Sequence, residues 1–298
     1  MNGKITHSLA APTTRFMHAA QKAADESLHK LGTGKSVNTG RDDPAALIAA
    51  NRLASELRIE RQSGENAQRA ANILSYIDYS LSEFQPILLT IQNAIHEGAN
   101  DLSDQELKAA QFQIDQGVDQ LTQMWRMASF NGRPALRPDG AATDGKVRYH
   151  FDVGSSGGNS NLDIAFDTPS PARLGSAVAK LTDLASGGSH DLRSGQFTEA
   201  FEVVKAATQQ VATIRGEVGA VRSMVLDPAA NMAQIAAENL AQAISQIEDT
   251  DYAAETDRLS RSQTLAQATL VVRRDAVTNA GDLLMALVET SRQIGQIL

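Results

Sequence analysis

The stretch AQRAANILSYIDYSLSEFQPILLTIQNAI, residues 67–95, decides the fold of this 298-residue chain. Its apolar residues recur at alternating intervals of three and four, which places them on one face of an α-helix packed lengthwise against other helices. We call such a face a seam; this one contains Ala67, Ala70, Leu74, Ile77, Leu81, Phe84, Leu88, Ile91 and Ile95. A helix over residues 44 to 100 would be roughly 85 Å long, too long for the interior of a compact globule. Pro86 is expected to kink it, because proline lacks a backbone donor.

Two further stretches repeat this spacing. The first opens with a capping box formed by Ser103 and Glu106. The second ends at Asp227-Pro228, where we predict that one helix stops and that Asp227 caps the next. In the same way, Asp43 is predicted to cap the long helix that starts at Pro44. These two seams contain Leu107, Ala110, Ile114, Gly117, Leu121, Met124 and Ala128, and then Ala200, Val204, Ala207, Val211, Ile214, Val218, Val221 and Val225.

The middle of the chain has a different pattern. Residues 133–195 are rich in Gly, Ser, Asp and Pro, and apolar residues alternate with polar ones over 147–153 and 162–166. This period of two, interrupted by a Gly- and Ser-rich loop, predicts a β-hairpin. We therefore predict a mainly α fold, a long antiparallel coiled-coil rod formed by the N- and C-terminal halves, with a small central insert that contains the hairpin. The predicted boundaries are 1–42 and 255–298 for the terminal helical parts, 43–132 and 199–254 for the rod helices, and 133–198 for the insert.

The rod seam is predicted to bury its larger apolar residues within the chain. These residues are Leu74, Ile77, Leu81, Phe84, Leu88, Ile91, Ile114, Leu121, Val204, Val211, Ile214 and Val218. The two ends of the chain carry thinner apolar stripes with too few partners of their own. Because isolated helices are marginal in water, we expect the ends to become ordered only when other subunits cover them. The predicted self-assembly interface consists of Leu9, Phe16, Leu28, Leu31, Leu265, Val272, Leu283, Leu287 and Ile294.

Composition and charge narrow the class of function. The net charge is −8 and no basic stripe is present, which argues against nucleic-acid binding. The chain has no cysteine, so disulfides and thiolate metal sites are excluded. The N-terminus has no apolar signal region, and no apolar run is long enough to span a membrane. We therefore expect no membrane insertion and, for an exported chain, no cleaved signal peptide.

No pattern in the sequence supports catalysis or a cofactor. The segment Gly32-Thr-Gly-Lys-Ser36 is similar to the end of a phosphate-binding loop, but His29 stands where the motif needs its first glycine. We interpret it as a helix-ending turn. Histidines 7, 18 and 29 share one helix face but lie too far apart to bind one metal ion. Trp125, the only tryptophan, is expected to make a core or inter-helix contact. We predict no enzyme activity, no cofactor and no metal.

Several collinear motifs resemble bacterial flagellin. Residues 28–53, LHKLGTGKSVNTGRDDPAALIAANRL, resemble the family signature LxxLSSGxRINSAxDDAAGxAIA. Residues 129–132 (SFNG), 151–154 (FDVG) and 214–221 (IRGEVGAV) are similar to its QFNG, QVG and RxxLGAxQ motifs. Residues 237–240 (AENL), 247–255 (IEDTDYAAE), 260–263 (SRSQ) and 265–268 (LAQA) continue its C-terminal block. The family's usual ending is replaced by residues 280–287, which lack its Pro and Gln, and residues 288–298 extend beyond it.

The resemblance implies a structural subunit that polymerises into the flagellar filament for motility, with the terminal helices lining the filament core. It also implies type III export, an export chaperone, a filament cap and neighbouring hook-associated proteins as partners, and an extracellular location. One alternative is the hook–filament junction protein, a hook-associated protein that shares the Asp42-Asp43-Pro44 type of turn. A specialised minor flagellin is another. A cytosolic coiled-coil adaptor, from a different class, would also explain the heptads.

Overall fold

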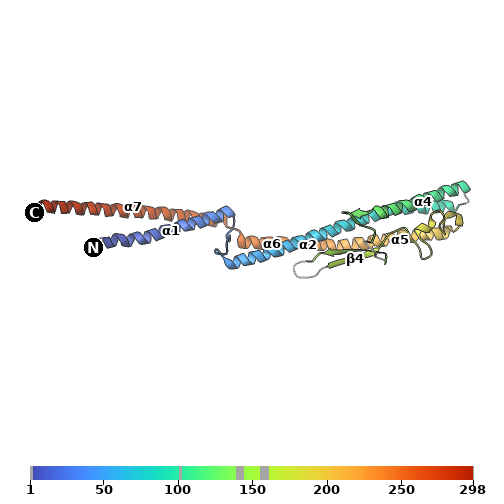
Figure 1. The fold of residues 1–298 in the computed structure, drawn as a ribbon, viewed down its shortest axis with the longest axis horizontal. Coiled ribbons are helices and arrows are strands. Elements are labelled where there is room, and N and C mark those ends of the chain that lie inside the picture. The colour runs from blue at the N-terminus through green and yellow to red at the C-terminus, as the bar shows by residue number, and fades with distance from the viewer. Residues whose placement is uncertain (1–2, 101–102, 139–143, 155–160, 298) are drawn as a thin grey trace. The chain divides into compact units, whose positions relative to one another are not determined.

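The computed structural model describes residues 3–100, 103–138, 144–154 and 161–297. It contains two compact units, which we describe separately. The terminal unit comprises residues 1–55 and 239–298, and the central unit comprises residues 56–238. The predicted fold class is confirmed: long helices dominate, and in the sequence a small insert with two hairpins separates the two helical halves. Figure 1 shows strand β4 (Asn161–Asp167) of this insert beside α5 (Phe197–Val221).

The predicted long helix is divided in two. Helix α2 covers Pro44–Ser82 and α3 covers Phe84–Gly98, with the break at Glu83. Pro86 explains the break, because it has no N–H for the carbonyl of Ser82 and its ring crowds that carbonyl. The predicted kink is therefore confirmed, whereas the single helix over 44–100 is wrong. At the start of α2, Asp43 Oδ1 accepts the N–H groups of Ala45 and Ala46, as predicted for a cap.

Helix α4, Asp104–Met127, starts with the predicted capping box. The Ser103 N–H donates to Glu106 Oε2 at 2.9 Å, and the Glu106 N–H donates to Ser103 Oγ at 3.5 Å. In the central unit α3 packs against both α4 and α5 (Phe197–Val221), which brings the predicted seams into one apolar core. All twelve predicted rod-seam residues are at most 5% exposed, including Leu121 and Val211, which are completely buried.

The helix that starts with α5 does not stop at Asp227-Pro228. Residues Arg222–Leu226 form a turn of π-helix, and α6 follows at once over Asp227–Glu248. The Asp227 N–H bonds to the carbonyl of Arg222, five residues back, and Asp227 itself has helical backbone angles. The prediction that Asp227 caps a new helix is therefore wrong. The wide turn inserts one residue ahead of Pro228, a local change that accommodates a proline within a helix.

The same π-turn corrects the predicted seam. We expected Val225 to continue the apolar face, but its side chain is 39% exposed, whereas Leu226 is completely buried. An extra residue in one turn rotates the following residues by about 100° around the helix axis. The rotated face continues with Ala233 and Ala237, which are buried. The prediction for Val225 is wrong because regular helical spacing was extrapolated across the inserted residue.

The insert contains the predicted hairpin and a smaller one. Strands β3 (Lys146–Asp152) and β4 (Asn161–Asp167) pair antiparallel, with Tyr149 opposite Ile164. Strands β1 (Ser129–Phe130) and β2 (Arg133–Pro134) pair across a turn at Asn131 and Gly132, both with positive φ, which is typical of a two-residue hairpin turn. Two short 3₁₀-helices, Leu181–Leu184 and Leu192–Ser194, precede α5.

Trp125 attaches the insert to the helices. Its indole N–H donates to the Leu136 carbonyl and to Thr168 Oγ1, both at 3.0 Å, and its ring packs against the core. The expected core contact is therefore confirmed. Because an indole N–H needs a partner when it is partly buried, this side chain fixes the loop after β2 and the end of β4 against α4.

Candidate assembly interface

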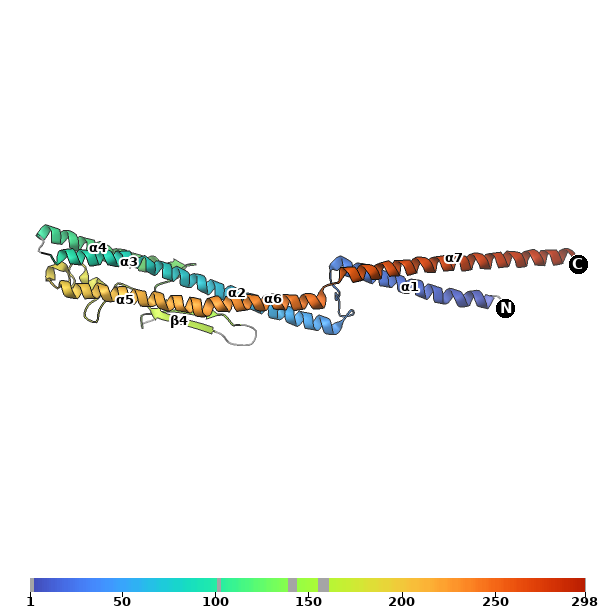
Figure 2. The ribbon, with the colours of Figure 1, turned by 180° about the vertical axis from the view of Figure 1, so that it is seen from behind.

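The terminal unit consists mainly of two long helices. Helix α1 covers Gly3–Thr33 and α7 covers Tyr252–Ile297. In Figure 1 and Figure 2 they lie side by side and antiparallel, with the two chain ends at the same end of the pair. Their side chains are described from residue 14 on α1 and, continuously, to residue 275 on α7.

The ends of the helices are defined by local hydrogen bonds. Helix α1 stops at Gly34, which has a φ of 73° and donates its N–H to the carbonyl of Lys30. This confirms the predicted helix-ending turn, because glycine adopts the left-handed conformation at little cost. Helix α7 starts at a cap, where Asp251 Oδ1 accepts the N–H groups of Ala253 and Ala254 at 3.0 and 3.1 Å.

Backbone contacts join the two helices just beyond these ends. The Thr250 N–H donates to the Gly34 carbonyl at 2.9 Å, and the Ser36 N–H donates to the Glu248 carbonyl at 2.6 Å. Lys35 Nζ lies 2.5 Å from Glu248 Oε2. The residues that resemble a phosphate-binding loop therefore bind another part of the same chain. They hold the end of α1 next to the start of α7.

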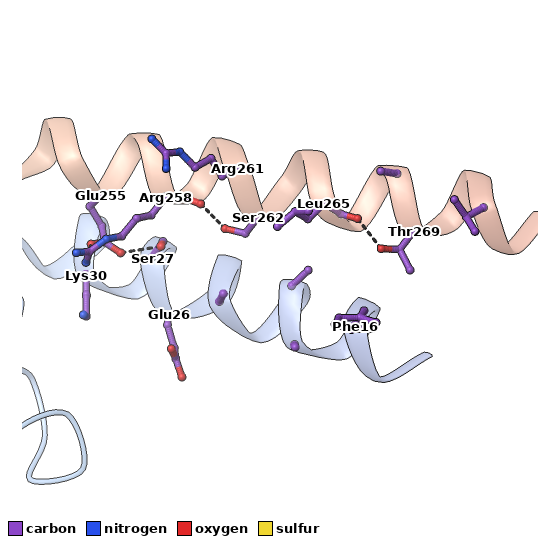
Figure 3. A pocket seen from close by; sticks show the side chains of 15 residues that line it. Phe16, Glu26, Ser27, Lys30, Glu255, Arg258, Arg261, Ser262, Leu265 and Thr269 are labelled. Atoms are coloured by element: carbon purple, nitrogen blue, oxygen red, sulfur yellow. Dashed lines mark hydrogen bonds and ion pairs between the residues drawn. The ribbon is translucent and has the colours of Figure 1, made fainter. Parts of the chain in front are cut away.

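A groove of about 700 Å³ runs between α1 and α7. We call it the α1/α7 groove, and Figure 3 shows it from close by. Most of its lining is apolar: Phe16, Ala19, Ala20 and Ala23 come from α1, and Leu265, Ala268 and Val272 come from α7. Charged and hydroxyl side chains gather toward the capped end, where the lining includes Glu26, Ser27, Lys30, Glu255, Arg258, Arg261 and Ser262.

A buried polar contact crosses the groove at that end. Ser27 Oγ donates to Glu255 Oε1 at 2.6 Å, and Arg258 Nη1 lies 3.1 Å from Glu255 Oε2. Ser27 is 4% exposed and Glu255 is 5% exposed. A carboxylate that loses water needs such partners, so both oxygens of Glu255 are occupied.

The predicted interface residues fall into three groups. Phe16, Leu265 and Val272 line the groove and remain 69%, 60% and 57% exposed. Leu28 is 52% exposed outside the groove lining, and Leu31 is half-buried. The remaining four, Leu9, Leu283, Leu287 and Ile294, lie outside the residues whose side chains the structure describes. Their role stays a prediction.

The sequence reasoning missed the polar part of the groove. Ser27, Glu255 and Ser262 are buried, although their residue types are usually exposed. They occupy seam positions on the helices. Glu255 is the last residue of the motif 247–255 that resembles the flagellin C-terminal block. A search restricted to apolar residues could not find them.

In the part of the chain that the structure describes, the arrangement offers surfaces for packing. No cluster of three or more metal-ligating side chains occurs among the described residues, and none of their helices is long and apolar enough to cross a membrane. The pKa of Asp42 is held below its ordinary value of 3.8, chiefly by the backbone N–H of Thr39 and then that of Asn38. This carboxylate holds the turn before α2.

The comparisons with known proteins agree with these helices. Residues 5–138 match the bacterial flagellin N-terminal helical region, and residues 201–277 match the bacterial flagellin C-terminal helical region. The chain is similar to a flagellin of Bacillus subtilis (24% identical, covering 95% of this chain and 99% of the relative). It is also similar to the flagellar filament 30.7 kDa core protein of Treponema maltophilum, with 26% identity and the same two coverages. A flagellar filament core protein of Brachyspira hyodysenteriae is 25% identical, over 95% of this chain and 98% of the relative.

Proposed function

This chain belongs to the bacterial flagellin family, and from that premise we propose that it polymerises through the α1/α7 groove and the exposed apolar side chains around it. Members of this family are structural subunits of the extracellular flagellar filament, and the chain is such a subunit. What we propose is the surface through which the subunits contact one another in the filament. The observation that carries it is the exposure of Phe16, Leu265 and Val272, three large apolar side chains at one groove.

Apolar burial provides the driving force for this assembly. Burying apolar surface is worth about 25 cal/mol per Å², and a filament repeats each contact along its whole length. A contact between different surfaces of two identical subunits builds an open helical polymer when its rotation does not close into a ring. A groove that receives a segment of the next copy is a contact of this kind.

We also propose that the chain is exported with α1 intact, through the flagellum's own type III channel. Phe16, Ala19 and Ala20 line the groove, so removal of an N-terminal leader of about 20–30 residues would remove this part of the surface on which assembly depends. An export chaperone is expected to cover the apolar side chains before assembly, and the cap and hook-associated proteins are expected to contact the terminal helices afterwards. Mass spectrometry of the filament protein checks whether the N-terminus is uncut.

Truncation provides the direct test of the interface. Chains lacking residues 1–30 or 256–298 should remain soluble with the central unit folded, because that unit has its own core. They should not form filaments in electron micrographs, whereas the full chain should. Long filaments from either truncated chain would show that the interface lies elsewhere.

A pair of point variants separates the interface from general surface effects. Leu265→Ser removes a 60% exposed side chain from the groove, and Val178→Ser removes a 76% exposed side chain in the central unit. Both variants should keep the parent's helicity, since exposed positions contribute little to stability. Only Leu265→Ser should raise the concentration at which filaments appear. Equal effects of the two substitutions would contradict the proposal.

A further inference from the structure

Helix α7 has a second apolar face that matches the first. The face toward α1 carries Leu265 and, seven residues on, Val272. Leu270 and Val277 repeat the same two residue types at the same spacing. At 100° per residue the second face lies about 140° around the helix from the first. Leu270 and Val277 are 50% and 67% exposed, so the terminal unit leaves this face open.

Hydrophobicity alone does not determine which face of α7 turns toward α1. Each of these two pairs offers one leucine and one valine, and α1 contributes the methyl groups of Ala19, Ala20 and Ala23 together with the 69% exposed Phe16. A surface of small side chains has few pockets that would accept one set of large side chains and reject the other. The two orientations of α7 would therefore bury similar apolar area. Another interaction must choose between them.

The buried polar contact makes this choice. Glu255, Ser262 and Thr269 are spaced by seven on the side of α7 that lines the groove, and Glu255 accepts the hydroxyl of Ser27 at 2.6 Å. Rotation of α7 by about 140° would take the Glu255 carboxylate away from Ser27, which would lose its partner while still buried at the seam. A single buried polar residue is a known means of fixing the arrangement of paired helices.

Building on the proposed function, we propose that Ser27 and Glu255 fix the orientation of α7. In this orientation Leu270 and Val277 face away from α1 and contact a second copy of this chain in the filament. Arg258 supports Glu255 through the 3.1 Å ion pair and keeps its second oxygen paired. Glu255 is thus a positioning residue for assembly. The second copy is the occupant because the chain is a filament subunit and this face continues along the same helix that lines the α1/α7 groove.

Distance measurements between spin labels test the orientation directly. The chain has no cysteine, so Gln21→Cys on α1 and Gln267→Cys on α7 provide two unique, exposed labelling sites, and residue 267 does not share the spacing of seven that joins Leu270 and Val277. Labelled chains are assembled with a large excess of unlabelled parent chain, so that only distances within one chain are recorded. The parent should give one narrow distance distribution. Ser27→Ala/Glu255→Leu should broaden it or add a population shifted by about 10 Å, since opposite faces of a helix lie that far apart.

Two control variants identify the cause of any change. Glu255→Gln keeps an oxygen that can accept from Ser27, and Asp257→Asn removes an exposed carboxylate two residues away on the same helix. Both should retain the single parent distribution. Exclusion of the Ser27→Ala/Glu255→Leu chain from filaments, with the central unit still melting like the parent, also supports the proposal. An unchanged narrow distribution in that variant overturns it.

The outward face has a test of its own. Leu270→Ser/Val277→Ser should raise the critical concentration for assembly about tenfold or more, while the distance distribution stays that of the parent. Unchanged assembly of this variant contradicts contact with a second copy at that face. If truncated chains lacking a terminal helix still polymerise, the proposed function fails, whereas the distance measurement continues to report on α7 itself.

Discussion

The central unit and the terminal unit use the same spacing of side chains with opposite results. In the central unit the seam positions hold large apolar residues such as Leu74, Ile77 and Leu81, and all three are completely buried within the chain. In the terminal unit the buried seam positions hold Ser27 and Glu255, whereas Phe16 is 69% exposed. Heptad spacing therefore identifies a packing face. It does not tell whether that face is buried within the chain, because Phe16, Leu265 and Val272 are large and still exposed.

This difference predicts a large contrast in hydrogen exchange, the largest effect that we expect. In dilute monomer, amides around Ile77 and Leu81 should exchange at least about a thousandfold more slowly than those around Phe16 and Val272. Core amides open only with global unfolding, which requires about 5–15 kcal/mol, whereas thinly packed helices open locally.

Assembly should remove this contrast. In filaments the amides of α1 and α7 should become protected, because other copies then cover the groove. Mass spectrometry of the exchanging monomer and of the filament gives both measurements. Full protection of both terminal helices in the dilute monomer would mean that the terminal unit is complete without neighbours.

Leucine truncation compares the two seams at a single residue. Leu81→Ala removes a completely buried side chain and should lower the free energy of unfolding by about 2–5 kcal/mol. Leu265→Ala removes a side chain that is 60% exposed and should change the same quantity by less than about 0.5 kcal/mol. Denaturant unfolding of the monomer, followed by circular dichroism, measures both. Similar losses for the two variants would show that the α1/α7 groove is closed within the monomer.

The comparison also explains which features the sequence could predict. The seam over residues 67–95, the capping box at Ser103 and the β3–β4 hairpin follow from local spacing and turn chemistry, and the structure agrees with each. The kink near Pro86 was expected because a proline in a helix has a defined steric effect.

The remaining features depend on contacts that local patterns do not record. Val225 and Leu226 are adjacent apolar residues, and only the π-turn before Pro228 determines which of them is buried. Ser27 and Glu255 are 228 residues apart, and neither has a residue type that indicates burial. The sequence identified Leu265 and Val272 as apolar, but the matching pair Leu270 and Val277 became apparent only once the side of α7 facing α1 was known.

Two glycines test how tightly the central seam is packed. A Cβ at Gly117 would lie 2.6 Å from Ile91 Cγ1, so Gly117→Ala should destabilise the chain by about 1–3 kcal/mol. A Cβ at Gly216, within α5, would meet nothing within 4 Å. Gly216→Ala should therefore stabilise the chain by about 0.5–1 kcal/mol through the better helix propensity of alanine. Thermal unfolding distinguishes the two, and a neutral Gly117→Ala would indicate looser contact between α3 and α4.

A loss of stability smaller than that of Gly117→Ala is expected at the cap of α4. Ser103→Ala should lower stability by about 0.5–2 kcal/mol at neutral pH, because the first N–H groups of the helix lose an acceptor. The equivalent change at the start of α7, Asp251→Ala, should reduce helicity in the terminal unit without shifting the unfolding of the central unit. Helicity measured along the unfolding curve separates these two outcomes.

The pH dependence of the Ser103→Ala effect follows from Glu106. The Ser103 hydroxyl, and then the Ser103 backbone N–H, lower the pKa of Glu106 below its ordinary value of 4.5. A carboxylate with a lowered pKa in the folded state stabilises that state above the ordinary pKa, and this contribution disappears as the pH falls through the folded-state pKa. The difference in stability between parent and Ser103→Ala should therefore be greatest above pH 4.5 and should shrink below it. If the stability difference between parent and Ser103→Ala stays constant with pH, Ser103 alone stabilises the start of α4 and Glu106 does not contribute.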